Sequence, residues 1–429
     1  MKSTLRSHYL LTGALLLTLI GGHLRAQNSA NLATARQILK ETPLIDGHND
    51  VPWQYLSRAK NHMDEIRFDV STAALEPPMH SDIPRLKKGG LGAQFWSVYI
   101  PATSAGPGAV REVYTQIDVV HRLVARYPRQ FEMAYTADDI VRIHKQGKIG
   151  SLIGIEGGHA IENSLAVLRE LYRSGARYMT LTHSKNIDWA DSATEIPVHN
   201  GLTPFGKLVI REMNRLGMLV DLSHTSEKTM SDVLDMAQSP VIFSHSSARA
   251  VTGHPRNVPD AILKRLKKNG GIVMVTFVTP FINDDVRGYY LDLQVQQQRA
   301  KSQNPYDTTA FNRQMESWKT AHPMPRASLA DVAAHIDHIA KLIGVNHIGI
   351  GSDFDGIESV PEGLEDVSTF PALFAELMSR GYSRKDLKKI AGENMLRVMR
   401  ANEKTAARLQ RSDRPLDDLI DEIDEKKTP

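Results

Sequence analysis

The chain has 429 residues, of which 41% are hydrophobic and 24% charged, and it contains no cysteine. This is the composition of an ordinary globular protein, and the length is sufficient for one α/β barrel with insertions. The lack of cysteine excludes disulfides and excludes thiolate as a metal ligand or nucleophile. The formal net charge is only +3, which gives no reason to expect nucleic acid as a partner.

Residues 1–26 have the pattern of a secretory signal peptide. Lys2 and Arg6 precede an apolar run over 10–20, and small residues lead to a predicted cleavage site near Ala26. The run is shorter than the roughly 20 residues that span a bilayer, and no cysteine follows it for lipid attachment. Cleavage removes three basic residues, so that the remaining 49 Lys and Arg equal the 49 Asp and Glu. We expect an exported protein, periplasmic or secreted and without affinity for anionic membranes; an uncleaved membrane anchor is the alternative.

Eight short apolar runs are predicted to form strands, and amphipathic segments separate most of them. The runs are mostly apolar throughout, which is typical of strands covered on both faces. The predicted strands are 44–48, 91–99, 150–155, 178–182, 218–223, 240–244, 271–277 and 347–352. The predicted helices are 111–126, 160–174, 204–216, 226–237, 258–268 and 328–343, the last with Ser328 as its N-cap. This alternation predicts a (β/α)8 TIM barrel over residues 27–400, with an open doubly wound sheet as the alternative.

Two segments depart from this alternation. Residues 280–327 form a long polar stretch after the seventh predicted strand. We expect a loop insertion at the surface, and a lid over the barrel mouth is the alternative. Residues 401–429 are highly charged, which predicts a solvated or partly disordered helix outside the barrel domain.

Six of the apolar runs end in a histidine or a carboxylate, always at the carboxyl end. They are LIDGHND (44–50), SLIGIEGG (151–158), YMTLTHS (178–184), MLVDLSH (218–224), PVIFSHS (240–246) and HIGIGSDFDG (347–356). The carboxyl ends of the strands of a parallel barrel surround one mouth. Seven side chains are therefore predicted to converge there, and they indicate a metal-dependent enzyme: His48, Asp50, Glu156, His183, His224, His245 and Asp353.

Five of these side chains divide into two sets of metal ligands. His48 and Asp50 are two residues apart and so lie on one face of a strand end, although this pair alone is a weak indication. Glu156 follows an apolar run, where an unpaired carboxylate is costly to bury. Its two oxygens could bridge two ions, and a structural ion pair is the alternative. His224 and His245 complete the second set with Glu156. Nitrogen and oxygen ligands predict two Zn²⁺ ions, and Mn²⁺, Fe²⁺ or Co²⁺ are also compatible.

Three further roles concern a substrate. His183 is predicted to donate to an oxyanion rather than to bind metal. Asp353 is a candidate general acid-base group, and Asp355 is its alternative. Arg256 lies in the loop after the sixth strand, where a guanidinium could bind a carboxylate, and a surface ion pair is its structural alternative. Five further histidines are expected to be structural: His121, His144, His335, His338 and His347.

The motifs resemble those of one enzyme family. They are HNDVPW (48–53), GIEGGHAIEN (154–163), LTHSKNIDWAD (181–191), LVDLSHTSEKTM (219–230), PVIFSHSSARAV (240–251), RNVPD (256–260) and GSDFDG (351–356). Together with GLTPFGKLVIREMNRLGM and VPEGLEDVS, they are similar to the membrane (renal-type) dipeptidases, metallopeptidase family M19. The resemblance extends from about residue 38 to about residue 400, with the motifs in the expected order.

The resemblance implies a (β/α)8 barrel of the metal-dependent hydrolase (amidohydrolase) type, usually as a homodimer. It implies the same five zinc ligands with Glu156 as the bridge, His183 and Arg256 as substrate-binding residues, and Asp353 as the proton-transfer residue in contact with the substrate. Animal members are disulfide-linked and lipid-anchored, which a chain without cysteine and with a charged tail does not share. The segment 280–327 is longer than the family usually shows, which leaves the substrate preference open.

These features predict a zinc-dependent dipeptidase whose substrates include dipeptides with a C-terminal D-residue; some family members also open β-lactams. A hydroxide bridging the two ions would attack the scissile carbonyl, with His183 polarising the carbonyl oxygen and Asp353 as the proton shuttle. Arg256 would hold the C-terminal carboxylate and so limit substrates to two residues. The alternatives are a binuclear amidohydrolase acting on lactones, cyclic amides or N-acyl amino acids, and a metal-binding scaffold without activity.

Overall fold

The computed structural model describes residues 27 and 29–424, and the predicted signal peptide, residues 1–26, lies outside this part. The strands of this part form one parallel sheet in the order β2-β1-β9-β8-β7-β6-β5-β4-β3. Their bounds are β1 (Leu44–Asn49), β2 (Leu91–Tyr99), β3 (Phe131–Met133), β4 (Ile149–Glu156), β5 (Ala176–Thr180), β6 (Leu219–Asp221), β7 (Ile242–Ser246), β8 (Ile272–Val275) and β9 (Ile348–Ile350).

The sheet closes into a barrel because β2 also pairs with β4. The pairing runs from Ala93 opposite Gly150 to Tyr99 opposite Glu156. β3 pairs with the first residues of β4 and adds no strand to the ring. The eight strands of the ring coincide with the eight predicted runs, which confirms the (β/α)8 barrel and excludes the open sheet. The additional strand β3 was not predicted, since three residues are too few for a periodic pattern.

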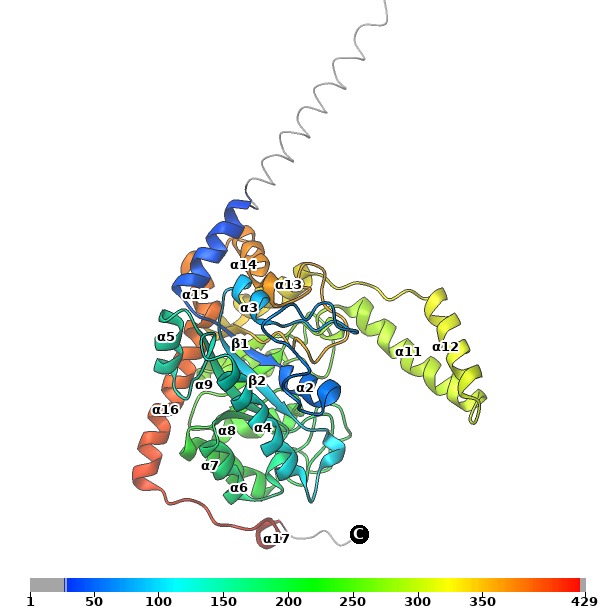
Figure 1. Cartoon of the computed structure of the whole chain (residues 1–429). Helices are drawn as coiled ribbons and strands as arrows, with labels where there is room; N and C mark the ends of the chain where they lie inside the picture. Colours follow the sequence, from blue (N-terminus) through cyan, green and yellow to red (C-terminus); the bar gives the residue numbers. More distant parts are fainter. Residues whose placement is uncertain (1–26, 28, 425–429) are drawn as a thin grey trace, which may run out of the picture.

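Helices surround the ring of strands (Figure 1). The longer ones are α2 (Val51–Ala59), α4 (Ala109–Arg126), α5 (Ala137–Lys145), α6 (Leu165–Arg173), α7 (Pro204–Leu216), α8 (Glu227–Met236), α9 (Asp260–Asn269), α11 (Asp284–Gln303), α12 (Thr308–Ala321), α13 (Leu329–Ile343), α14 (Phe370–Ser379) and α16 (Asn394–Ser412). The shorter ones are α3 (Ile83–Lys88), α10 (Thr279–Ile282), α15 (Arg384–Lys388) and α17 (Ile420–Ile423). The predicted cap of α13 is confirmed, because Ser328 N–H and Oγ both donate to Asp331.

The end of the barrel opposite the mouth is filled and covered. Strand residues pack inside the ring against α5 and α16, in a cluster that includes Ile45, Phe95, Leu152, Ile242, Met274, Ile140, Met395 and Met399. Asn394, the first residue of α16, donates to Ile348 O at the amino end of β9, at 2.8 Å. The carboxyl ends of the strands are therefore the end at which a site can open.

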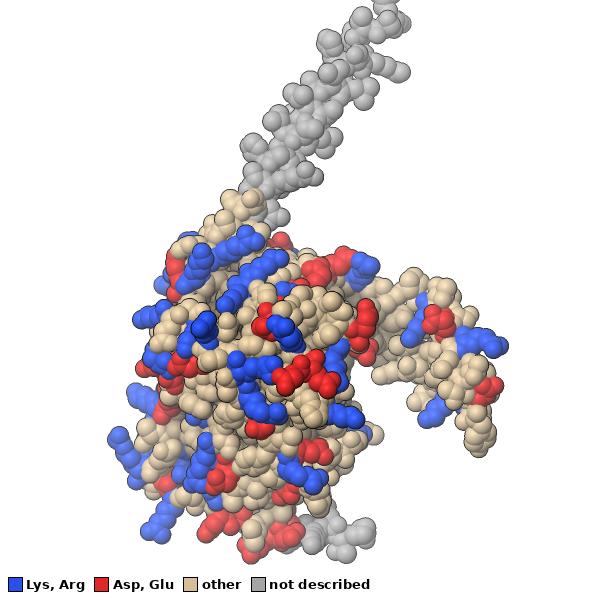
Figure 2. All heavy atoms as spheres, in the orientation of Figure 1, with Lys and Arg blue, Asp and Glu red and all other residues tan. Residues whose placement is uncertain are grey.

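Most of the segment 280–327 is helical rather than a loop. Helices α11 and α12 form a hairpin that projects from the barrel body (Figures 1 and 2). Within these two helices only Val286, Ala300 and Met315 are buried. The hairpin is therefore held by few apolar contacts.

The predicted boundary at residue 400 falls inside α16. Ala406 and Leu409 beyond it are buried, and Phe205 N–H, in the first turn of α7, donates to Asp424 Oδ1 at 2.9 Å. The described part of the predicted tail thus packs against α7 instead of being solvated throughout. Over residues 27 and 29–424, no helix has the length and apolar character needed to cross a membrane.

Candidate metal centre

The carboxyl end of β1 carries the first two predicted ligands. His48 belongs to β1, and Asp50 follows as the N-cap of α2. Both side chains are buried, and His48 Nε2 lies 3.4 Å from Asp50 Oδ2. His48 Nε2 has no hydrogen-bond partner within the described structure. The atom is therefore available as a ligand.

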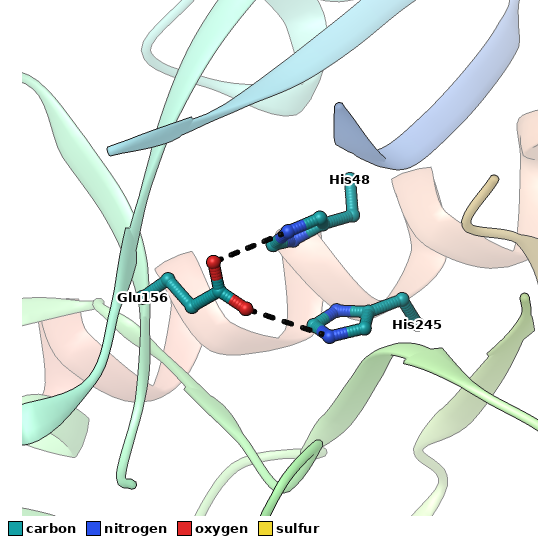
Figure 3. Close-up of side chains that lie close together, drawn as sticks. All are labelled: His48, Glu156 and His245. Atoms are coloured by element: carbon teal, nitrogen blue, oxygen red, sulfur yellow. Dashed lines mark ion pairs between the residues drawn. The ribbon is translucent and has the colours of Figure 1, made fainter. Parts of the chain in front are cut away.

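Glu156, the last residue of β4, lies at the centre of the cluster (Figure 3). Its Oε2 is 3.5 Å from His48 Nε2, and its Oε1 is 3.2 and 3.6 Å from Nε2 of His224 and His245. Burial raises the pKa of this carboxyl, but His48 and a hydrogen bond from His224 hold the pKa well below its usual range. Glu156 is therefore an anion with imidazoles on both of its oxygens.

His224 and His245 face each other across a short distance. His245 lies in β7, His224 follows β6 by three residues, and their Nε2 atoms are 2.9 Å apart. His224 has a φ of 68°, a left-handed conformation that costs energy in a residue other than glycine and is frequent at functional sites. Burial lowers the pKa of both imidazoles well below its usual value. The neutral form, which binds metal ions, is thereby favoured.

His183 lies beside this cluster, three residues after β5. Its Nε2 is 3.8 Å from Glu156 Oε1, and its ring centroid is 4.3 Å from that of His224. On its other side the ring of Tyr99 is 4.8 Å away. Burial lowers the pKa of His183, so the ring is neutral at neutral pH. The structure thus brings His183 to the edge of the cluster, facing the cavity described below.

The side chains present fit a divalent metal ion. Three sets of donor atoms lie within 4.8 Å of one another: His48, Glu156 and His245 (Figure 3); Glu156, His183 and His224; and His48, Asp50 and Asp353. A buried imidazole nitrogen without a partner is costly, and a metal ion would satisfy it. Nitrogen and oxygen donors suit zinc and other divalent transition metals.

These sets do not coincide with the two predicted ligand sets. They all share Glu156 or His48, and they include His183 and Asp353 in addition to the five predicted ligands. The donors form one continuous cluster. Which ligand belongs to which ion therefore stays a prediction.

Asp353 and Asp355 have different surroundings. Asp353 Oδ1 is 4.0 Å from His48 Nε2, and burial, with the charges of Asp50 and Glu156, raises its pKa to about 8. Asp355 instead accepts His80 N–H at 2.7 Å and is absent from the lining of the cavity. Asp353 is therefore the one of the two that faces the cluster.

Arg256 is buried, and its hydrogen bonds within the described structure go to neutral groups. Its Nη1 and Nη2 donate to Ser246 Oγ and His245 O, both at 3.4 Å, and its guanidinium lies 5.3 Å from the centroid of the Phe281 ring. Burial lowers its pKa to about 10, so the group remains charged at neutral pH. Since both partners are neutral oxygens, the positive charge is left for an anionic ligand.

These residues surround one cavity of about 390 Å³. It is lined by Asp50, Trp53, Tyr99, Glu156, His183, His224, Arg256, Val278, Phe281, Asp353, Gly356 and Ile357. A cavity of this size suits a small ligand. Of the segment 280–327, all of it described, Phe281 alone lines the cavity, and the α11–α12 hairpin contributes no residue to it.

Sequence reasoning missed the aromatic part of this lining. Trp53 and Tyr99 pack edge to face, with centroids 5.1 Å apart. Tyr99 ends a predicted strand, as the predicted ligands do, so the same positional rule could have found it. Trp53 and Phe281 carry no such signal, because an aromatic residue next to an apolar run is indistinguishable from core.

The sequence model of the membrane dipeptidases, Peptidase family M19, matches residues 32–413. The chain belongs to this family. The resemblance of its motifs is thereby confirmed, and membership supports a metallo-dipeptidase.

Three solved structures are similar to this chain over most of its length. The probable dipeptidase PvdM from Pseudomonas aeruginosa is 22% identical, with a TM-score of 0.74 over 88% of this chain and 100% of that one, and it supports the fold. Dipeptidase AC, a metallopeptidase of family M19, is 26% identical, with a TM-score of 0.67 over 84% and 98% of the two chains. A metallopeptidase from Rhodobacter sphaeroides, solved with a phosphinate mimic of the dipeptide L-Ala-D-Ala, is 25% identical, with a TM-score of 0.66 over 84% and 99%.

Proposed function

We propose that this M19 enzyme is a dinuclear zinc dipeptidase that cleaves the peptide bond of free dipeptides. The observation that supports the proposal is one small cavity that contains the donor cluster around Glu156, the carboxyl of Asp353 and the unpaired guanidinium of Arg256. A dipeptide has a carboxylate and a scissile carbonyl only a few atoms apart. The cavity offers a matching group for each.

The ligand roles follow the prediction from the sequence. One ion would be held by His48, Asp50 and Glu156, and the other by Glu156, His224 and His245. When bound, such ions lower the pKa of water and polarise a carbonyl oxygen, which supplies a nucleophile at neutral pH.

The remaining residues bind the substrate and move the proton. Arg256 holds the C-terminal carboxylate, so a longer peptide would place its next residue where the carboxylate must lie. His183 donates to the carbonyl oxygen. Asp353, whose pKa of about 8 is close to neutrality, carries the proton to the leaving amine nitrogen.

We extend the proposal to dipeptides with a D-residue at the second position. The support is the Rhodobacter sphaeroides neighbour, which was solved with a mimic of L-Ala-D-Ala.

Metal analysis combined with a substrate panel tests the proposal. We expect about two ions per chain, activity that is lost on chelation and restored by zinc, and hydrolysis of L-L and L-D dipeptides with D-L pairs for comparison. A single tightly held ion would require a mononuclear mechanism. Turnover of lactones, cyclic amides or N-acyl amino acids without turnover of any dipeptide would favour the amidohydrolase alternative.

Export and assembly are further parts of the proposal. The pattern of residues 1–26 supports cleavage near Ala26 and release to the periplasm or medium. Amino-terminal sequencing of the mature protein from its native host tests this. Family resemblance supports a homodimer, which light scattering of the purified protein would detect as twice the chain mass.

A further inference from the structure

Asp221, at the end of β6, is a buried carboxylate that the proposed mechanism does not use. Its Oδ1 accepts the N–H groups of Ser223 and Ser244, at 3.1 and 2.8 Å. Its Oδ2 accepts the hydroxyls of Thr180 and Ser244, both at 2.5 Å. Four donors thus converge on one side chain that is fully buried. The carboxylate acts purely as an acceptor.

Ser244 connects Asp221 to a proposed metal ligand. Its Oγ also lies 2.8 Å from His245 Nδ1. A hydroxyl has one proton, and that proton is directed to Asp221. The Ser244 oxygen must therefore accept from His245 Nδ1–H. In a neutral imidazole only one nitrogen carries a proton, so Nε2, which faces Glu156, keeps its lone pair.

Tyr178 imposes the same arrangement on His48. Its hydroxyl donates to the backbone oxygen of Gly47, at 3.2 Å, and lies 2.9 Å from His48 Nδ1. A carbonyl oxygen cannot donate, so both contacts are hydrogen bonds only when the Tyr178 proton points to Gly47 and the phenol oxygen accepts from Nδ1–H. The Nε2 atom of His48 again keeps its lone pair. His224 differs, because its Nδ1 has no partner among the described residues.

We propose that the Asp221–Ser244 pair and Tyr178 are positioning residues that fix the tautomers of His245 and His48, so that each imidazole presents an unprotonated Nε2 to a metal ion. The inference rests on the proposed function, in which both histidines are ligands. Groups that orient a ligand imidazole in this way contribute about 10- to 100-fold to metal affinity.

The geometry around Asp221 allows a variant that reverses the direction of the hydrogen bond between Ser244 and His245. In Asp221→Asn the side-chain oxygen is retained by the two backbone N–H groups, which places the amide nitrogen beside the Ser244 hydroxyl. The amide then donates to Ser244 Oγ, and the Ser244 proton turns toward His245 Nδ1. That proton favours the other tautomer, with its hydrogen on Nε2. Asp221→Asn should therefore weaken metal binding more than Ser244→Ala, which only removes the hydrogen bond between Ser244 and His245.

The experiment measures zinc affinity of the purified enzyme by competition with a chromophoric chelator. We expect Ser244→Ala to weaken binding about 10- to 100-fold, Asp221→Asn to weaken it further, and Ser244→Thr to retain it. Adding Ser244→Ala to Asp221→Asn should restore zinc affinity to the level of Ser244→Ala alone, because the double variant lacks the hydroxyl whose proton would point to His245 Nδ1. A purely structural role of Asp221 would instead give additive losses.

Matched substitutions of buried hydroxyls serve as controls. Ser151 Oγ accepts from Trp96 Nε1, and Tyr55 donates to Ile66 O; neither hydroxyl bonds to a ligand imidazole. Ser151→Ala and Tyr55→Phe should leave zinc affinity unchanged, whereas Tyr178→Phe should weaken it about 10-fold or more.

The outcomes separate this inference from the proposed function. If the wild-type enzyme binds no zinc and cleaves no dipeptide, the proposed function fails. If the wild type does both but Ser244→Ala and Tyr178→Phe bind zinc as tightly as their controls, the positioning roles are wrong. Circular dichroism and the melting temperature of each variant identify any loss of affinity that comes from misfolding.

Discussion

Gly356 lies so close to the candidate metal centre that a side chain there would have to displace its neighbours. A Cβ atom at this position would be 2.2 Å from Asp50 Oδ2 and 2.9 Å from Asp353 Oδ1. Gly356→Ala should therefore displace both carboxylates and lower zinc content and kcat/KM together, by about 100-fold or more for a displacement of this kind. Metal analysis and dipeptide kinetics of the variant measure the effect.

Gly288 provides the matched control, because a Cβ there would have no neighbour within 4 Å. Gly288→Ala lies in α11 and should leave zinc content and kinetics unchanged. If Gly356→Ala retained full zinc content, the close approach of Asp50 and Asp353 to the backbone would not be required for binding.

Substitutions should show that Asp353 acts in the chemical step and that Asp355 stabilises the fold. Asp353→Asn should lower kcat by about 10²- to 10⁴-fold, the usual contribution of a general acid-base group. Asp355→Ala removes the acceptor of His80 N–H and should cost about 1–3 kcal/mol of stability. Steady-state kinetics and thermal unfolding of both variants distinguish the roles. A kcat loss confined to Asp355→Ala would reverse the assignment.

Arg256→Ala should act on recognition of the substrate carboxylate. Loss of a buried charged partner costs about 2–5 kcal/mol, so kcat/KM for dipeptides should fall at least about 30-fold, mainly through KM. Dipeptide amides, which lack the carboxylate, should be cleaved equally by both proteins. An equal loss on the amides would mean that Arg256 does not bind the carboxylate.

The candidate site could be predicted to the extent that its residues are polar and end apolar runs. His48, Glu156 and His245 satisfy that rule and lie together. Tyr178 and Asp221 escaped it, because Tyr178 begins the predicted strand 178–182 and Asp221 lies inside the predicted strand 218–223, so neither residue ends a predicted run. Only the neighbouring strands show which imidazole each one contacts.

Some helices and strands were likewise predictable from the sequence, and others were not. The strands and most helices were predictable, because buried strands are short apolar runs and amphipathic helices repeat every 3.6 residues. The helices α11 and α12 have few apolar residues on any face, so periodicity did not reveal them. Their caps were nonetheless present in the sequence: Asn283 and Asp307 accept the N–H groups of Val286 and Ala310.

The hairpin of α11 and α12 should open far more readily than the barrel. It buries only three side chains, whereas α13 buries six, among them Ile336 and Ile339. Local unfolding is easier where few apolar contacts are lost. Native-state hydrogen exchange followed by mass spectrometry should show the amides of 284–321 exchanging at least about tenfold faster than those of 329–343. Equal protection of both segments would indicate that the hairpin is covered in solution.

At the scale of the whole molecule, His335 makes the free energy of unfolding depend on pH. His335 accepts Ala248 N–H at Nδ1 at 3.0 Å, and burial lowers its pKa from 6.5 to about 4. The unfolded chain binds a proton below about pH 6.5, whereas the folded protein resists it until about pH 4. The contribution of this histidine is therefore fully present above pH 6.5 and is lost as the pH falls toward 4, by up to about 3 kcal/mol.

His335→Asn tests this pH dependence because an amide does not titrate there. The stability advantage of the wild type over the variant should shrink by about 3 kcal/mol between pH 6.5 and 4 in urea unfolding. His322→Asn, at the exposed end of α12, serves as the control and should follow the wild type. An advantage that stays constant with pH would show that His335 titrates alike in both states.

The pairing of β1 with β9 has a consequence for the order of events during synthesis. These strands lie about 300 residues apart, and Asp46 pairs with Ile350. The ring cannot close until the ribosome has made almost the whole barrel. Until then β1 and β8 present open edges, which invite pairing with other chains. Newly made molecules therefore need protection from one another until the last strand emerges, and only then can His48 and Asp353 meet.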